Sequence, residues 1–303
     1  MKGTIMWYDP ITRYTLGISL MFSFYWLSKR LVVSPLFAAG KLPNKSKNLI
    51  DTALLYIPGL GLLLLLIKDM PVLQVVPKNF SVLDYIVVFI AQFFAFALIG
   101  LFGIIETKIG LVSIKTLENQ TTESNKGINA ILLFAVVPFL EELLNRQLPS
   151  NILGTVDLRL YLYLSAIVFS LLHLQTGRIA VAVGMLYTGF LWAWVYASSG
   201  SLILCTVYHM LFNLMMVFIP DYLEKTKKGH GVYLACLAVM GTIGFLLFVF
   251  NFAHYIPPEL TDGQSPWLSI LGNWGFWVLV VICVFSYFYA LKNIKAKGKL
   301  SDK

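Results

Sequence analysis

Long apolar runs recur along most of the chain and constrain its fold more than any other feature. Several approach or exceed the roughly 18–20 residues that a helix needs to cross a bilayer core. Backbone groups in hydrocarbon must be paired within their own segment, and the runs are too continuous for the alternating strands of a transmembrane barrel. We therefore predict helices near residues 15–27 (or as far as 38), 52–67, 83–105, 128–145, 159–175, 179–197, 201–219, 232–254 and 267–291.

The composition excludes an ordinary soluble domain. Of the 303 residues, 58% are hydrophobic and only 13% are charged, and the mean hydropathy is +0.77. Soluble domains carry roughly 25% charged residues, so this chain lacks the polar surface that would keep it in water. The prediction is an all-α integral membrane protein, a polytopic helical bundle of eight or nine transmembrane helices that form one membrane domain.

The net charge of +8 reflects how the chain is oriented in the membrane, and it does not indicate a nucleic-acid ligand. Basic residues beside membrane spans follow the positive-inside rule and contact anionic lipid headgroups. They occur in the loop 28–50, in the connection that holds Lys225, Lys227 and Lys228, and in the tail, as Lys292, Lys295, Lys297, Lys299 and Lys303. We place these three regions, and so the C-terminus, in the cytoplasm, and the connection with Glu259 and Asp262 outside. Membrane lipids are expected partners, and nucleic acid is not.

The three cysteines do not indicate a disulfide framework or a thiolate zinc cluster. Cys205, Cys236 and Cys283 are widely separated, and each falls inside an apolar run. Free cysteine behaves as a small hydrophobic residue. We expect all three to be buried.

Ionisable residues inside an apolar span are costly and indicate a functional site. The run 128–145 contains Glu141 and Glu142, which are followed by Arg146. On a helix Glu142 and Arg146 are four residues apart and can pair. Glu141 lies about 100° around the helix, on the face of Asn145, and is free to face a cavity as a base. The alternative is a solvated helix end at the membrane interface.

Two later helices add imidazole and amide groups. His173 ends an apolar run, and Phe169, one turn earlier, lies on the same face. His209 and Asn213 are also one turn apart and point to one side of their helix. A single intramembrane histidine can be a buried structural residue, but two of them with an amide and a glutamate pair favour an active site.

These motifs resemble the CPBP family, the CAAX proteases and bacteriocin-processing enzymes also called the Abi family. Its pattern is Glu-Glu-x-x-x-Arg, then Phe-x-x-x-His, then His-x-x-x-Asn, and the chain matches it in order over roughly residues 128–216. Family members commonly have an apolar or aromatic residue at the place of Asn145 and often glycine at the place of Gln147. These departures imply an altered site polarity or substrate preference.

The resemblance implies an intramembrane endopeptidase with catalytic residues Glu141, Glu142, Arg146, His173, His209 and Asn213. Glu141, helped by His173, would activate a water molecule, and Glu142 with Arg146 would orient the site. His209 and Asn213 would donate hydrogen bonds to the developing oxyanion. The family is also described as metalloproteases. Glu141, His173 and His209 suit a divalent metal such as zinc, whereas a His-Glu-x-x-His helix is absent, so metal dependence stays open.

The resemblance also suggests a division of the chain. We expect N-terminal transmembrane helices over 1–127, a CPBP/Abi-like core over 128–219, and C-terminal transmembrane helices with a basic tail over 220–303. The expected membrane is the bacterial plasma membrane. The expected substrate is a membrane-associated peptide or protein.

Two other functions use the same residues. One is a catalytically silent scaffold, or an immunity or regulatory protein, that acts through a partner membrane protein. The other is a transporter, which predicts internal repeats and broken helices in corresponding halves. No repeat is evident, although Gly184 and Gly189 either loosen their helix or allow close packing.

The predicted boundaries leave one geometric conflict. Glu141 falls near the far end of its segment and His173 near the cytoplasmic end of the next. Straight spans would separate the two residues by roughly 15 Å in depth. Either the boundaries are wrong, or the segments are tilted, broken or unequal, with Pro138 as a site for a kink.

Overall fold

A computed structural model of the chain describes residues 9–43, 47–67, 81–111, 132–153, 157–225, 229–250 and 265–301. These residues form helices, and no strand occurs among them. The N-terminal helices are α1 (Pro10–Ser28), α2 (Ser34–Ala38), α3 (Lys47–Ile67), α4 (Val82–Ala91) and α5 (Phe94–Lys108). The middle helices are α8 (Val137–Glu142), α9 (Leu148–Leu153), α10 (Leu158–His173), α11 (Ile179–Ser199), α12 (Leu202–Asn213) and α13 (Ile219–Lys225). The last are α14 (His230–Phe250), α16 (Pro266–Leu271) and α17 (Trp274–Ser301).

The helices are long and apolar enough for a multi-pass membrane protein. In the described part of the chain, six helical stretches have the length and hydropathy of membrane spans. These are Pro10–Ala38, Val82–Lys108, Leu158–Thr176, Ile179–Ser199, His230–Phe250 and Trp274–Lys295, and the shorter apolar helices are Leu49–Leu65 and Leu202–Met216. Each predicted segment overlaps helix within the described residues, and residues 128–131 and 251–254 of two segments lie outside them. The predicted all-α polytopic fold is confirmed.

Prolines explain where the helices widen into π-helical turns. The described residues contain four such turns, and each ends two residues before a proline: Lys29–Val33 before Pro35, Leu132–Val136 before Pro138, Leu143–Gln147 before Pro149, and Leu214–Phe218 before Pro220. A proline has no N–H, and its ring collides with the carbonyl four residues earlier. A wider turn removes that collision. In it, Leu148 donates its N–H to the carbonyl of Leu143, five residues back.

The helix that carries the glutamates is longer than predicted, which removes the conflict in depth. The predicted end at 145 is wrong, because helix continues through Leu153. Arg146 is buried with its charge paired and does not mark the membrane surface, and Leu148 and Leu153 behind it belong to the core. The stretch 146–153 adds about 12 Å between Glu141 and the end of its helix. Glu141 therefore lies nearer to the depth of His173.

Two predicted segments are interrupted where a polar side chain turns inward. The predicted segment 83–105 breaks at Gln92–Phe93, and the buried Gln92 accepts a hydrogen bond from the Trp192 indole at 3.0 Å. The predicted segment 267–291 breaks at Gly272–Asn273, where Asn273 accepts from the Phe276 N–H at 3.0 Å and so begins α17. The apolar pattern alone did not show either break.

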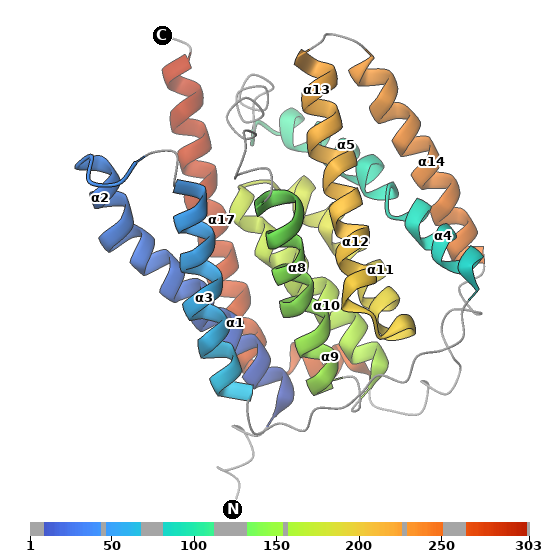
Figure 1. The fold of residues 1–303 in the computed structure, drawn as a ribbon, viewed down its shortest axis with the longest axis horizontal. Helices are drawn as coiled ribbons and strands as arrows, with labels where there is room; N and C mark the ends of the chain where they lie inside the picture. The colour runs from blue at the N-terminus through green and yellow to red at the C-terminus, as the bar shows by residue number, and fades with distance from the viewer. Residues whose placement is uncertain are drawn as a thin grey trace, which may run out of the picture.

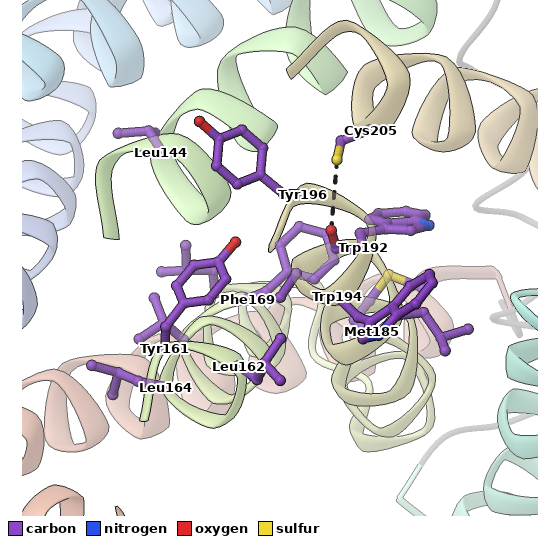
Figure 2. Close-up of a cluster of buried hydrophobic side chains, with 14 of the residues drawn as sticks. Leu144, Tyr161, Leu162, Leu164, Phe169, Met185, Trp192, Trp194, Tyr196 and Cys205 are labelled. Carbon is purple, nitrogen blue, oxygen red and sulfur yellow. Dashed lines mark hydrogen bonds between the residues drawn. The ribbon is translucent and has the colours of Figure 1, made fainter. Parts of the chain in front are cut away.

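The core lies where α10 and α11 pack against each other, behind α8 and α12 (Figure 1). A Cβ on Gly189 of α11 would lie 3.1 Å from the Cα of Ala166 on α10, so glycine permits this close approach. Of the two roles considered for Gly189, close packing is the one observed. Figure 2 shows the buried aromatic cluster at this contact, with the Cys205 thiol directed at the Trp192 carbonyl at 3.6 Å.

The outer helices pack around this core in two groups. On one side α1 packs against α3 and α17, and on the other α14 packs against α4 and α5 (Figure 1). Cys205 and Cys283 are buried as predicted, but Cys236 is exposed on α14, so its predicted burial is wrong. The run that holds Cys236 is apolar on all sides, and only some of its faces meet other helices.

Basic residues gather at one end of the bundle. One end of α13 and the C-terminal end of α17 lie at the top of Figure 1, and α2 lies lower at the left. Lys29, Arg30, Lys41, Lys225 and Lys292 belong to these helices or to residues near their ends, and Lys47 begins α3. Other predicted markers of topology lie outside the described residues: Lys45, Lys227, Lys228, Glu259, Asp262 and Lys303. The proposed division at 127–128 lies outside them too, and that at 219–220 falls inside the continuous helix from α12 to α13.

Candidate active site

A buried ion pair forms the inner part of the site. Arg146 Nε lies 3.0 Å from Glu142 Oε2, and both side chains are fully buried, at 0% exposure. This confirms the pairing predicted from their spacing. The N–H of Arg146 is not well aligned with the oxygen, so charge attraction holds the pair. Arg146 Nη1 also donates to Ser165 Oγ of α10 at 2.7 Å, which ties the glutamate helix to α10.

His209 links the two neighbouring glutamates. Its Nδ1 lies 2.9 Å from Glu142 Oε1, and its Nε2 lies 3.6 Å from Glu141 Oε2. Because a carboxylate accepts, Nδ1 carries a hydrogen and donates to Glu142. Consecutive helical residues point about 100° apart, and the imidazole fills the angle between the two carboxylates.

Glu141 faces a small cavity, as its position on the helix predicted. Its side chain is 23% exposed, in contrast with the buried Glu142. Its Oε1 lies 3.3 Å from the hydroxyl of Tyr56 on α3, and Asn145 Nδ2 donates to its backbone carbonyl at 2.8 Å. The cavity has a volume of about 20 Å³. One water molecule needs roughly 10–15 Å³ on the same measure, so a single water fits beside the carboxylate.

His173 lines the same cavity from the end of α10. Its Nδ1 lies 2.8 Å from the carbonyl of Phe169, so Nδ1 carries a hydrogen and donates to that oxygen. A neutral ring then has its lone pair on Nε2. The structure therefore brings Glu141 and His173 to one cavity although they lie on separate helices.

Aromatic rings support the imidazoles and the guanidinium. Phe169 packs edge-on against His173 with ring centroids 4.5 Å apart, as predicted, and Arg146 lies 4.7 Å above the Phe169 ring. Trp192 stacks on His209 at 4.4 Å, and its indole is held in turn by Gln92. These contacts fix the ring planes, and the apolar walls keep bulk water away from the charges.

A tight turn sets the direction of α12, the helix of His209. Gly200 ends α11 with φ +64°, a left-handed conformation that glycine adopts without a Cβ clash. Ser201 then caps α12 by accepting the Leu204 N–H at 3.1 Å. Asn213 ends α12 one turn beyond His209, on the same side of the helix. It does not line the cavity beside Glu141.

Five of the predicted site residues are thus close to one another: Glu141, Glu142, Arg146, His173 and His209. Their roles stay predictions. Sequence reasoning missed Tyr56, Ser165 and Trp192. A hydroxyl or indole in an apolar run is common and gives no signal of its own, because such residues occur widely in membrane helices.

The candidate metal ligands were Glu141, His173 and His209. Among the residues that the structure describes, no group of three or more His, Cys, Asp or Glu side chains is arranged to hold a metal ion. Nδ1 of each histidine is turned to an oxygen of the protein, so Nε2 is the ring nitrogen that could bind another group. The three side chains are not gathered into a metal site as they stand, and metal dependence stays a prediction.

Comparison with known proteins gives one match. Residues 124–215 match the family model described as type II CAAX prenyl endopeptidase, Rce1-like. Comparison with curated proteins found no match, and comparison with solved structures found none either. The matched stretch contains all three motifs and their helices. At the level of the family it supports an intramembrane endopeptidase. The resemblance of this chain to the CPBP family of CAAX proteases is therefore confirmed over residues 124–215, as an Rce1-like domain.

Proposed function

We propose that the chain hydrolyses a peptide bond in a membrane-associated peptide or protein, with Glu141 as the base that activates water. The main support is one observation: the partly exposed carboxylate of Glu141 and the imidazole of His173 line the same water-sized cavity inside the bundle. A base must lie within hydrogen-bond reach of the water that it deprotonates. The match to an endopeptidase family points to the same reaction.

In the first step, water between Glu141 and His173 loses a proton to the carboxylate, and its oxygen attacks the carbonyl carbon of the scissile bond. The C–O bond forms as the carbonyl π bond breaks, which leaves a tetrahedral oxyanion. His173 accepts a hydrogen bond from the water at Nε2, since its Nδ1 donates to Phe169. Because the water gives its two hydrogens to Glu141 and His173, a lone pair on its oxygen is left to point toward the substrate.

In the second step, the C–N bond breaks and the proton on Glu141 passes to the leaving nitrogen. Before that, His209 stabilises the oxyanion by donating a hydrogen bond, a contribution of about 3–4 kcal/mol for one well-placed donor. Asn213, one turn further along the same side of α12, would add a second donor once the site widens around the substrate. For this role His209 needs a proton on Nε2, and it would then donate to Glu142 through Nδ1 and to the substrate through Nε2. Glu142 and Arg146 hold the ring in that orientation.

The first substrates to test are peptides with a prenylated C-terminal CAAX sequence, since the matched family is named for them. We further propose that the end of the bundle with the basic residues faces the cytoplasm, with the C-terminus, in a bacterial plasma membrane. The cavity holds only one water, so the site has to widen for a peptide to enter.

The test compares purified wild type with Glu141→Gln in detergent and in liposomes. The substrates are a farnesylated CAAX peptide, a palmitoylated peptide and the same peptide without lipid. We expect Glu141→Gln to lower kcat at least 10³-fold, because an amide cannot take the proton. Glu106→Gln is the matched control, as it also neutralises a buried glutamate, outside the site. A chelator arm is expected to leave wild-type kcat unchanged.

Two results would contradict the proposal. In the first, Glu141→Gln cleaves the peptides at the wild-type rate; in the second, folded wild type cleaves none of them. In the second case a Glu141→Gln protein that still performs the cellular function favours the scaffold or immunity role. A loss of activity with the chelator that returns with zinc would assign the water activation to a metal.

A further inference from the structure

Tyr56 reaches the candidate base from a helix outside the matched stretch. It lies on α3 (Lys47–Ile67), whereas the family match covers residues 124–215. Its side chain is nearly buried, at 6% exposure. Its hydroxyl donates to Glu141 Oε1 at 3.3 Å, and the ring lines the cavity that Glu141 and His173 share.

The place of α3 is fixed by contacts with α1, so the hydroxyl arrives from a defined direction. A Cβ on Gly59 would lie 2.0 Å from the Met21 side chain, which shows how closely that side chain fills the groove beside Gly59. Lys29, the residue after α1, has its Nζ 2.8 Å from Asp51 Oδ2 of α3. These contacts above and below Tyr56 leave its ring little freedom along the helix axis.

The two oxygens of the Glu141 carboxylate have different neighbours. Oε1 faces the Tyr56 hydroxyl, and Oε2 faces His209 Nε2 at 3.6 Å. A glutamate side chain has three rotatable bonds, and the last of them is broad and roughly two-fold. A donor at one oxygen therefore restricts which way the other oxygen points.

We propose that Tyr56 is a positioning residue for Glu141: its hydroxyl holds Oε1 so that Oε2 stays directed at the water and at His209. This inference rests on the proposed function of Glu141 as a base. The separation of 3.3 Å is longer than the 2.7–2.8 Å typical of O–H···O bonds, and catalytic contacts of this kind tighten when substrate is bound. Tyr56 acts through Glu141 and does not take part in proton transfer.

The kinetic test is Tyr56→Phe, which removes the hydroxyl and keeps the ring that lines the cavity. We expect kcat to fall about tenfold and KM to stay within twofold, because the substrate surface is unchanged and only the orientation of the base is lost. The control is Tyr187→Phe. The Tyr187 hydroxyl donates to the Ala91 carbonyl at 3.0 Å, away from the site. This control should lose no more than twofold in kcat.

A stability measurement tests the contact itself without any substrate. The melting temperature is measured for Tyr56→Phe, Glu141→Ala and the double variant. If the hydroxyl and the carboxylate interact, Tyr56→Phe lowers the melting temperature of wild type but not that of Glu141→Ala. Equal shifts in the two backgrounds would overturn the contact.

The outcomes separate this inference from the proposed function. If wild type cleaves the peptide and Tyr56→Phe is equally active, the proposed role of Tyr56 is overturned and the peptidase proposal stands. A fall in kcat that comes with a loss of stability much larger than that of Tyr187→Phe makes the hydroxyl structural, which also overturns the proposal. If wild type cleaves nothing, the peptidase function fails, and with it the role of Tyr56 in positioning a base.

Discussion

The buried pair of Glu142 and Arg146 allows the sharpest test of the site's electrostatics. Arg146→Met keeps much of the volume and the apolar stem of the side chain but removes the charge. It would leave Glu142 fully buried, with only His209 beside it. It would also remove the donor that Ser165 accepts at 2.7 Å and the cation above the Phe169 ring.

Breaking a buried pair from one side costs about 3–5 kcal/mol, because the remaining charge is uncompensated in a low dielectric. We expect Arg146→Met to lose that much of the free energy of unfolding. The double variant Glu142→Gln, Arg146→Met removes both charges. Replacing a whole buried pair with neutral groups is often neutral or stabilising, so the double variant should recover most of the loss.

The free energy of unfolding is measured by equilibrium unfolding in mixed micelles, with each variant purified at the same detergent-to-protein ratio. Peptidase activity is measured in parallel. We expect kcat of the double variant to stay at least 10²-fold below that of wild type, since His209 loses its ionic partner. The reasoning is refuted if Arg146→Met is as stable as wild type. It is also refuted if the double variant is less stable than Arg146→Met, because the two charges would then not compensate each other.

Two further predictions concern residues away from the reacting groups. Glu106 pairs with Arg178 at 3.0 Å and accepts the Ala180 N–H at 3.1 Å, so Glu106→Gln should cost about 1–3 kcal/mol in stability and leave kcat of the folded protein unchanged. Gly189→Leu should cost about 1–3 kcal/mol, because its side chain would enter the contact of α10 with α11. Unfolding curves of the two variants check both predictions. Gly61→Leu is the control for Gly189→Leu, because a Cβ on Gly61 would meet open space.

The sequence was sufficient to predict an all-α polytopic membrane fold, because hydrocarbon requires long helices with few charges. It was not sufficient to place their ends. The predicted end near 145 is where the apolar run meets Arg146, and the helix continues because Arg146 pairs with Glu142 inside the bundle. The breaks at Gln92 and Asn273 depend on hydrogen bonds to residues on other helices. Such partners are invisible in an apolar pattern.

The site was predictable to the extent that it follows from helix spacing. The pairing of Glu142 with Arg146 and the contact of Phe169 with His173 are both one-turn relations within a single helix. Contacts between different helices could not be predicted from the sequence. The stacking of Trp192 on His209 depends on how the helices cross, which spacing along one chain does not specify.

Two adjacent glutamates have different surroundings for a geometrical reason. A helix turns by about 100° between neighbours, so one carboxylate can face the core while the next faces a cavity. Glu142 takes the inner direction and meets Arg146, and Glu141 takes the outer one. His209 contacts both through its two ring nitrogens, which lets the inner pair set the orientation of the ring at the outer carboxylate. The π-helical turns before Pro138 and Pro149 lie on either side of the two glutamates, and a wider turn shifts the side chains that follow it around the helix axis. The turn before Pro138 therefore bears on the direction in which Glu141 points, and Arg146, through Glu142, bears on the ring of His209 that faces it.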